Sequence, residues 1–250
     1  MNKDLLTNIT SNADELHRKN EELRKVNDQL DGFVYSCYHD LKGPIATLMG
    51  LINLTKMEKE CDKLDWHIEM IRKSIVKLDQ RVNDIISFSK NSRLEIKKEE
   101  VDIQRMILGI LEKYISTDEY KHISSLVEID QRYTALCDIT RLEIIFNNLI
   151  LNALQYADRS KYHCYLSVTG EVTSEKIVLH FRDNGIGIHN SLLDKVFNMF
   201  YRGSDRSIGV GLGLYVAKES VAKLNGTIEV DSTVGIGSNF TVSLPNKSSN

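Results

Sequence analysis

Two short glycine-rich segments have the composition of a phosphate-binding loop. Residues 183–188 read DNGIGI after a strand-like run, and residues 209–214 read GVGLGL at the start of an apolar helical stretch. Glycine allows a positive φ and a close approach of the backbone, and a helix N-terminus offers N–H groups to an anion. A Rossmann site would place the glycines directly after a strand of a βαβ unit, and a P-loop would add a lysine. GVGLGL instead follows a loop of about 20 residues, and no such lysine follows the glycines, so we expect a phosphate site of another kind.

Asn148 and Asn152 are candidate ligands of a metal ion. They lie four residues apart in the stretch NLILNA, so they share one face of the expected helix. Amides on a largely apolar helix need polar partners. Two amide oxygens facing a cleft suit Mg²⁺, which prefers hard oxygen ligands and shares them with phosphates.

The first 91 residues have the pattern of two long helices. Residues 6–37 form a heptad with apolar spacings of three and four, and a second such stripe runs from Leu64 to Ile85. Residues 56–62 form a short polar turn between them, which predicts an antiparallel helical hairpin. Asn20 and Asn27 at heptad a positions favour a defined register, and two hairpins would close a dimeric four-helix bundle. The alternative is one amphipathic helix packed in a monomer.

The pattern changes after Ser92 to short strands mixed with helices. We expect strands at 126–130, 135–138, 165–169, 177–182, 227–231 and 239–244, and helices near 102–116, 140–157 and 212–224. The fold class is therefore α+β, with an α/β sandwich after the helical hairpin. We expect a coiled-coil extension at 1–13, the hairpin at 14–91 and the sandwich at 97–246, joined by a mobile linker.

Composition excludes several classes of protein. The 250 residues carry a net charge of −3, which gives no reason to expect a nucleic-acid partner. The four cysteines have neither zinc-site nor disulfide-framework spacing, so we interpret them as reduced thiols of a cytoplasmic protein. No apolar run is long enough to span a membrane. If the full protein is a membrane-bound sensor, this chain is its cytoplasmic portion.

Five motifs in order resemble the boxes of bacterial sensor histidine kinases. HDLKGP, NNLILNALQYA, DNGIGI, VFNMFYR and GVGLGL resemble the H, N, first-glycine, F and second-glycine boxes, from about residue 14 to Pro245. One box would be weak evidence, whereas five at family-like spacing are specific. The resemblance implies a histidine phosphotransfer hairpin and an ATP-binding domain that autophosphorylates with ATP and Mg²⁺. It also implies a homodimer that passes the phosphoryl group to an aspartate of a response regulator.

The resemblance assigns the chemistry of the hairpin to two residues. His39 would be the phosphoacceptor, since a neutral imidazole is a nucleophile near physiological pH. Asp40 would be the adjacent general base. Adjacent residues of a helix do not face each other squarely, so this contact needs a favourable rotamer. Pro44 lacks an N–H and should bend the helix just past the histidine.

The resemblance also assigns roles around the nucleotide. Asn148 and Asn152 would hold Mg²⁺ between the phosphates, and Asp183 would accept a hydrogen bond from the adenine amino group. Residues from about 189 to 209 would form a lid, anchored by Phe197 and Phe200. The remaining nucleotide-binding residues it implies are Tyr156, Gly185, Gly187, Arg202, Gly209, Gly211, Leu212 and Gly213. A plain packing role for Tyr156 is an equal alternative.

Two positions depart from the family pattern. Gln155 stands where the family usually has Lys, Arg or His, so one positive charge near the phosphates is missing unless Arg206 compensates. Gly43 stands where Thr or Asn often orients a water, which predicts weak phosphatase activity toward the partner.

Two other functions stay open at this point. A hydrolytic ATPase of the gyrase or heat-shock chaperone kind would resemble the C-terminal half, but such enzymes typically have a Glu at the equivalent of Asn148 to activate water. A degenerate kinase that serves as a dimeric scaffold or nucleotide sensor is the second alternative. The sequence does not decide whether phosphoryl transfer runs within one subunit or between two.

Overall fold

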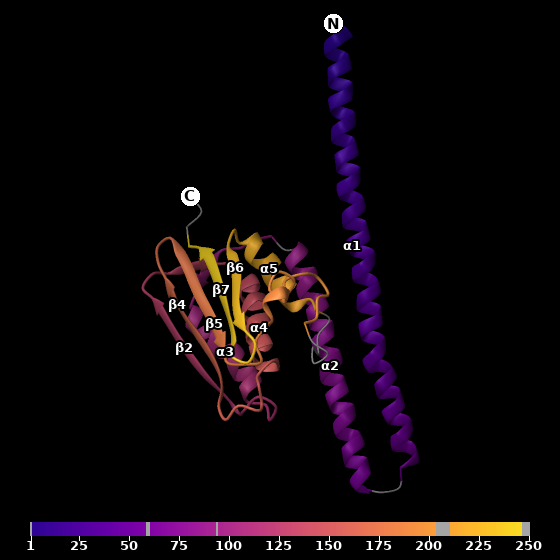
Figure 1. Cartoon of the computed structure of the whole chain (residues 1–250), viewed down its shortest axis with the longest axis vertical. Helices are drawn as coiled ribbons and strands as arrows, with labels where there is room; N and C mark the ends of the chain where they lie inside the picture. Colours follow the sequence, from indigo (N-terminus) through magenta and orange to yellow (C-terminus); the bar gives the residue numbers. More distant parts are fainter. Residues whose placement is uncertain (1, 59–60, 94, 204–210, 247–250) are drawn as a thin grey trace. The chain divides into compact units, whose positions relative to one another are not determined.

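The computed structural model describes residues 2–58, 61–93, 95–203 and 211–246. The chain divides into two compact units, Met1–Leu78 and Asp79–Asn250. In the first unit, α1 (Asn2–Met57) and α2 (Cys61–Arg93) run antiparallel as the expected hairpin (Figure 1). Helix α2 continues past Leu78 into the second unit. Helix α1 is continuous through Pro44. No helix in the described part of the chain combines the length and apolar content that a membrane span requires.

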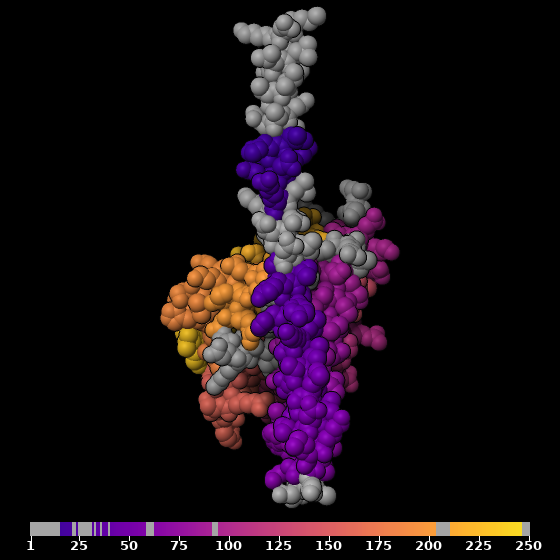
Figure 2. All heavy atoms as spheres, turned by 90° about the vertical axis from the view of Figure 1, so that its right-hand side faces the viewer, coloured from indigo at the N-terminus to yellow at the C-terminus, as the bar shows by residue number. Residues whose placement is uncertain are grey.

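The single hairpin leaves many of its apolar side chains exposed. Cys37 and Leu51 are buried on α1, whereas Met49 is 62% exposed. On α2, Ile68 and Ile75 of the predicted apolar stripe are 57% and 52% exposed. Figure 2 shows the hairpin in space-filling view. One hairpin therefore does not bury its own stripes, although the a and d side chains of 6–37 lie largely outside the described residues.

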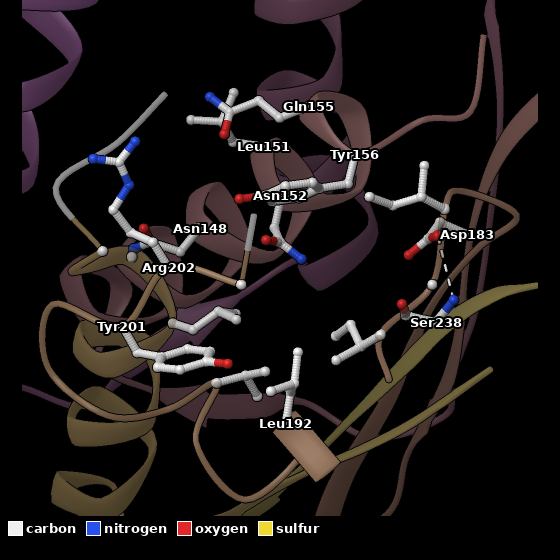
Figure 3. Close-up of a pocket in the computed structure, with 18 of the residues that line it drawn as sticks. Asn148, Leu151, Asn152, Gln155, Tyr156, Asp183, Leu192, Tyr201, Arg202 and Ser238 are labelled. Atoms are coloured by element: carbon white, nitrogen blue, oxygen red, sulfur yellow. Dashed lines mark hydrogen bonds between the residues drawn. The ribbon is translucent and has the colours of Figure 1, made fainter. Parts of the chain in front are cut away.

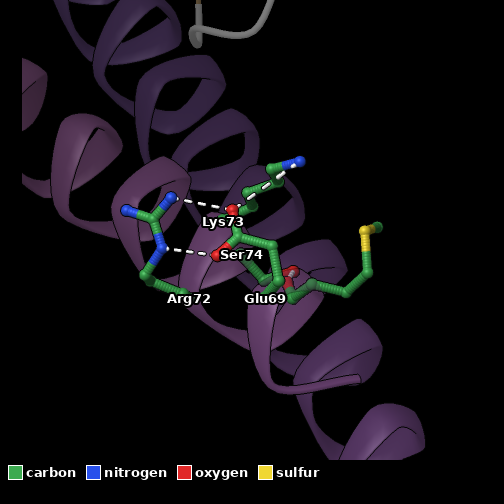
Figure 4. A network of polar contacts seen from close by, with 5 residues as sticks. Glu69, Arg72, Lys73 and Ser74 are labelled. Carbon is green, nitrogen blue, oxygen red and sulfur yellow. Dashed lines mark hydrogen bonds and ion pairs between the residues drawn. The ribbon is translucent and has the colours of Figure 1, made fainter. Parts of the chain in front are cut away.

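A group of charged residues occupies the solvent side of α2 (Figure 4). Glu69 accepts hydrogen bonds from Arg72 Nε at 2.8 Å and Arg72 Nη2 at 2.7 Å, and Lys73 Nζ lies 3.7 Å from Glu69 Oε1. The bond from Arg72 lowers the pKa of Glu69. Such exposed pairs at helical spacing add little stability, so the hairpin depends on apolar packing.

The second unit is built around a five-stranded sheet. Its order is β2-β4-β5-β7-β6, with β2 and β4 parallel and the other neighbours antiparallel. The strands are β2 (Ile123–Gln131), β4 (Cys164–Val172), β5 (Lys176–Asp183), β6 (Thr227–Thr233) and β7 (Gly237–Pro245). Two short strands, β1 (Glu99–Val101) and β3 (Ala135–Cys137), form a separate antiparallel pair.

Helices cover one face of this sheet and leave the other to solvent. They are α3 (Ile103–Ile115), α4 (Ile139–Gln155) and α5 (Gly213–Lys223), and Figure 1 shows them on the same side of the sheet. Alternate strand residues, such as Leu179, Phe181 and Phe240, are buried beneath them. Period-two burial is expected for a sheet with one covered face. The mixed helix–sheet fold predicted from the sequence is confirmed.

The start of α4 is fixed by a buried polar cluster. Asp138 caps the helix by accepting a bond from Arg141 N at 2.8 Å, and it also accepts one from Arg141 Nη1 at 2.9 Å. Lys97 N donates to the same carboxylate at 2.9 Å. An N-cap of this kind satisfies amides that the first helical turn leaves unpaired. The cap thereby sets the position of the two asparagines farther along α4.

Candidate functional site

A pocket in the second unit lies among α4, the segment after β5 and the start of α5 (Figure 3). Eight of the residues predicted from the sequence line it: Asn148, Asn152, Tyr156, Asp183, Gly187, Arg202, Gly211 and Gly213. These residues are spread along the sequence from Asn148 to Gly213, so only the fold brings them together. The pocket is therefore the candidate functional site.

Asn148 is oriented by its own helix. Its Nδ2 donates to Ile144 O at 2.7 Å, which turns Oδ1 outward. A Cβ added at Gly213, the first residue of α5, would lie 2.7 Å from this Oδ1. The amide oxygen therefore faces the N-terminus of α5, where N–H groups favour an anion. Asn152, one turn farther along α4, also lines the pocket.

This donor set fits a magnesium ion that is shared with phosphates. Two amide oxygens alone cannot complete the six-fold oxygen shell that Mg²⁺ demands, so phosphate and water oxygens must supply the rest. Among the described residues, no cluster of three or more His, Cys, Asp or Glu could hold a metal. The site thus suits an ion that arrives with its phosphate ligand better than a permanently bound one.

Asp183 lies at the other end of the pocket, at the end of β5. Its Oδ1 accepts bonds from Gly185 N at 2.7 Å and Ser238 N at 3.3 Å. The carboxylate also has an oxygen turned toward the pocket (Figure 3). Burial raises the pKa of Asp183, although the bonds from Gly185 and Ser238 and the charge of Lys161 oppose the shift. A buried acceptor of this kind is suited to a specific donor on a ligand.

The glycines of DNGIGI are needed for close backbone packing. A Cβ at Gly185 would lie 2.3 Å from Tyr156 O. Gly187 has a φ of +70°, and a Cβ there would lie 2.1 Å from Thr233 O. Gly187 lines the pocket, whereas Gly185 lies behind it and positions Asp183. The sequence identified these glycines, but what excludes a side chain at either position is neighbouring backbone, the carbonyls of Tyr156 and Thr233.

The apolar walls of the pocket were not identified from the sequence. They are Leu151, Ile186, Ile188, Leu192, Val196, Leu214 and Val234, with Tyr201 beside them. Ser238, which donates to Asp183, was missed as well. Two of these residues, Ile186 and Ile188, belong to the DNGIGI motif, which is the signal that could have identified them. Apolar walls with a few placed polar groups are typical of a small-molecule site.

The described ends of the predicted lid are held in place. Phe197 is buried and packs edge-on against Phe240, with ring centroids 6.3 Å apart. Phe200 is partly buried and has a φ of 63°, and its N–H donates to Gly211 O at 3.0 Å. Gly211 has a φ of +77°. Residues 204–210, including Arg206 and Gly209, lie outside the described residues, so their predicted roles stay predictions.

Three other predicted residues lie away from the pocket lining. Leu212 is completely buried at the N-cap of α5. His39 is exposed on α1 in the first unit. Asp40 is part of the same helix, but its side chain lies outside the described residues, so its predicted contact with His39 stays a prediction.

The chain is similar in sequence to several known proteins. Residues 137–248 match the family model described as histidine kinase-, DNA gyrase B- and HSP90-like ATPase. Cyanobacterial phytochrome B of Nostoc sp. strain PCC 7120 is 29% identical over 245 residues, which cover 94% of this chain and 32% of that protein. The sensor histidine kinase AtsR of Burkholderia thailandensis is 25% identical over 222 residues, which cover 86% of this chain and 37% of that protein.

A solved structure extends the likeness to the fold of both units. Histidine kinase ThkA, in complex with the response regulator protein TrrA, has a TM-score of 0.68 at 21% identity, over 91% of this chain and 66% of that one. The second unit thus matches this ATPase family in sequence over residues 137–248. Over most of its length the chain is similar to sensor histidine kinases, although it spans only about a third of the curated relatives described here.

Proposed function

We propose that this chain is the kinase portion of a sensor histidine kinase, which transfers the γ-phosphate of ATP to His39. The observation that carries the proposal is one pocket with Asn148 and Asn152 on one side and Asp183 on another, in a chain with an exposed His39. The phosphoryl group then passes to an aspartate of a response regulator, which is a separate protein. The chain acts in the cytoplasm, where ATP and receiver domains are found.

The pocket orients the nucleotide between two fixed ends. The Asp183 carboxylate accepts a hydrogen bond from the adenine amino group, and the apolar walls pack against the base. The oxygens of Asn148 and Asn152 would hold Mg²⁺, which when bound would supply positive charge near the phosphates. Arg202, which lines the pocket, approaches the γ-phosphate from the lid. Phosphoryl transfer depends mainly on such positioning and charge neutralisation.

The transfer step forms one bond and breaks another. A neutral imidazole nitrogen of His39 attacks the γ-phosphorus, and the bond from that phosphorus to the β–γ bridging oxygen breaks, which releases ADP. The proton on the other ring nitrogen goes to the Asp40 carboxylate, which thereby raises the nucleophilicity of the ring. Exposure of His39 on α1 is consistent with access for a separate domain. Domain movement of this kind would precede chemistry.

The fate of the γ-phosphate tests the proposal against its alternatives. The whole chain is incubated with Mg²⁺ and γ-labelled ATP. Label on the protein that is lost in acid supports the kinase. Free phosphate without labelled protein would instead indicate a hydrolytic ATPase, and no turnover at all would indicate a degenerate scaffold. Asn148 argues against the ATPase, because an amide cannot act as the base that activates water.

The Gly213→Ala variant is expected to bind Mg²⁺–ADP about tenfold more weakly than the wild type. The added Cβ would lie 2.7 Å from Asn148 Oδ1, so the amide oxygen has to move out of place. Calorimetry of ADP with and without Mg²⁺ measures the effect. Gly109→Ala on α3 is the matched control, because nothing lies within 4 Å of its added Cβ. If Mg²⁺ strengthened ADP binding as much in Gly213→Ala as in the wild type, the assignment of Asn148 as a magnesium ligand would be contradicted.

We also propose that the chain forms a homodimer through the hairpin. The exposure of Ile68 and Ile75 in a continuous apolar stripe supports this, because such a stripe needs a partner. The Ile75→Asp variant is expected to be monomeric at micromolar concentration, where the wild type is dimeric. Sedimentation equilibrium measures the difference. Lys77→Asp, an exposed position on the same helix, should leave the dimer intact, and a dimeric Ile75→Asp variant would be evidence against this interface.

A further inference from the structure

Lys161 lies in an unusual polar environment that no sequence motif singled out. Its Nζ donates to Asn184 O at 2.6 Å and to Gly235 O at 2.7 Å. It also lies 3.2 Å from Gly185 O and 3.2 Å from Ile236 O. The ammonium therefore contacts two successive carbonyls from each of two segments, the loop after β5 and the turn between β6 and β7.

Four converging carbonyl oxygens are unfavourable without a cation. Each oxygen carries partial negative charge, and here all four face one point. A lysine ammonium has three N–H donors, so it can make two short bonds and share its remaining capacity between the two longer contacts. A neutral side chain could not offset the mutual repulsion of the carbonyls. The positive charge of Lys161 therefore favours the close approach of these two segments.

The two segments that Lys161 joins are the ones that position Asp183. Gly235 N donates to Ile186 O at 2.8 Å, and Gly187 packs against the carbonyl of Thr233. A Cβ at Gly237 would lie 2.1 Å from Asp183 O, so β7 starts directly against Asp183. The charge of Lys161 also lowers the pKa of Asp183 against the effect of burial. Displacement of either segment would therefore move the carboxylate.

We propose that Lys161 is a positioning residue for the adenine end of the nucleotide site, acting as a built-in cation that holds the loop after β5 against the β6–β7 turn. The proposal rests on the function proposed above, since it concerns the same pocket. Lys161 does not line that pocket, so it acts through Asp183 and Gly185. Its substitution should change nucleotide affinity more than the rate at saturating ATP.

The geometry suggests an informative rescue experiment. Backbone carbonyls that converge on one point are also the ligands that replace the hydration shell of K⁺ in proteins. The Lys161→Ala variant would leave the four oxygens without their cation and open the space of the side chain. Potassium or ammonium ions should then occupy that space and restore the loop, whereas a large cation such as choline should not.

Calorimetric affinity for ADP tests this in the whole chain, in choline, potassium and ammonium chloride at about 0.15 M ionic strength. We expect Lys161→Ala to bind about tenfold more weakly than the wild type in choline chloride, with most of the loss recovered in the potassium and ammonium salts. Lys176→Ala, which removes an exposed lysine paired with Glu171 at 3.8 Å, is the matched control and should bind ADP like the wild type in all three salts.

Two further variants cover the case in which Lys161→Ala does not fold. Lys161→Arg keeps a positive charge and should retain affinity within about threefold, whereas Lys161→Met, similar in length but neutral, should lose about tenfold. Equal affinities of these two variants, or a loss in Lys161→Ala that is the same in every salt, would overturn the proposal. A wild type that does not bind ADP would instead refute the proposed function. In that case, hydrogen exchange of the backbone amides of residues 184–187 in the nucleotide-free variants would still show whether Lys161 holds this loop in place.

Discussion

The His39→Gln variant is expected to incorporate γ-phosphate at least about a thousandfold more slowly than the wild type. Its affinity for ADP should be unchanged. A glutamine amide is not a nucleophile, so removal of the imidazole removes the acceptor and not the donor site. His39 is exposed on α1 in the first unit, whereas the pocket belongs to the second. Substitution should therefore separate transfer from binding. Acid-labile label on denaturing gels measures the first, and calorimetry with ADP measures the second.

A second histidine of the same helix provides the control. Nε2 of His17 lies 3.7 Å from Oε1 of Glu21, and the His17 side chain is 80% exposed. His17 is not part of an HDLKGP motif. His17→Gln should be labelled at the wild-type rate. If His39→Gln were labelled as fast as His17→Gln, the acceptor would be another residue. If His39→Gln lost ADP binding as well, the two activities would not be separable in the way that the proposal requires.

The Asp183→Asn variant is expected to bind ADP about ten- to a hundredfold more weakly, because the adenine amino group loses a charged acceptor. Asparagine Oδ1 can still accept the bonds that Gly185 N and Ser238 N make in the wild type. The loop should thus keep its shape. The loss of affinity would then report on the ligand contact and not on local unfolding.

The same substitution should stabilise the protein without nucleotide at neutral pH. Burial raises the pKa of Asp183 above its value in the unfolded chain. A carboxyl group whose pKa is higher in the folded than in the unfolded state destabilises the folded protein. This cost begins once the pH exceeds the pKa in the unfolded chain, about 3.9, and it is complete above the pKa in the folded state. Asparagine removes this cost at pH 7, whereas below about pH 3.9 both side chains are neutral and the difference should disappear.

Thermal unfolding at several pH values measures this second effect. Asp231→Asn on β6 is the matched control, because Asp231 is exposed and lies outside the pocket lining. It should change neither ADP affinity nor the pH dependence of unfolding. An Asp183→Asn variant with wild-type affinity would contradict the adenine assignment. One that melts lower than the wild type at pH 7 would mean that the carboxylate has a mainly structural role.

The elements with clear hydrophobic periodicity were predictable from the sequence. All six expected strands and all five expected helices are present, because period-two and period-3.6 patterns reflect which residues the core buries. The three-residue strand β1 was missed, since only Val101 of Glu99–Val101 is buried and its pairing with β3 is its main support. Short elements defined by tertiary pairing have little local signal.

The polar part of the candidate site was predictable, but its support was not. Asn148, Asn152 and Asp183 belong to motifs whose residue types indicate their chemistry. Ser238 and Lys161, in contrast, are ordinary strand and loop residues that strand register and chain reversal bring close to Asp183 and Gly185. The partners of Lys161 are backbone carbonyls, which every residue has, so no residue type marks them. The dimer, the mobile linker and the role of Asp40 stay predictions.

The most direct test of the account is to locate the phosphoryl group in the wild-type chain after incubation with ATP and Mg²⁺. The protein is digested and analysed by mass spectrometry at alkaline pH, where phosphohistidine survives. We predict one phosphorylated peptide, which contains His39, and the loss of its phosphate in acid. Phosphate on any other residue, or ATP consumed with no phosphopeptide, would contradict the claim that the nucleotide in this pocket phosphorylates His39.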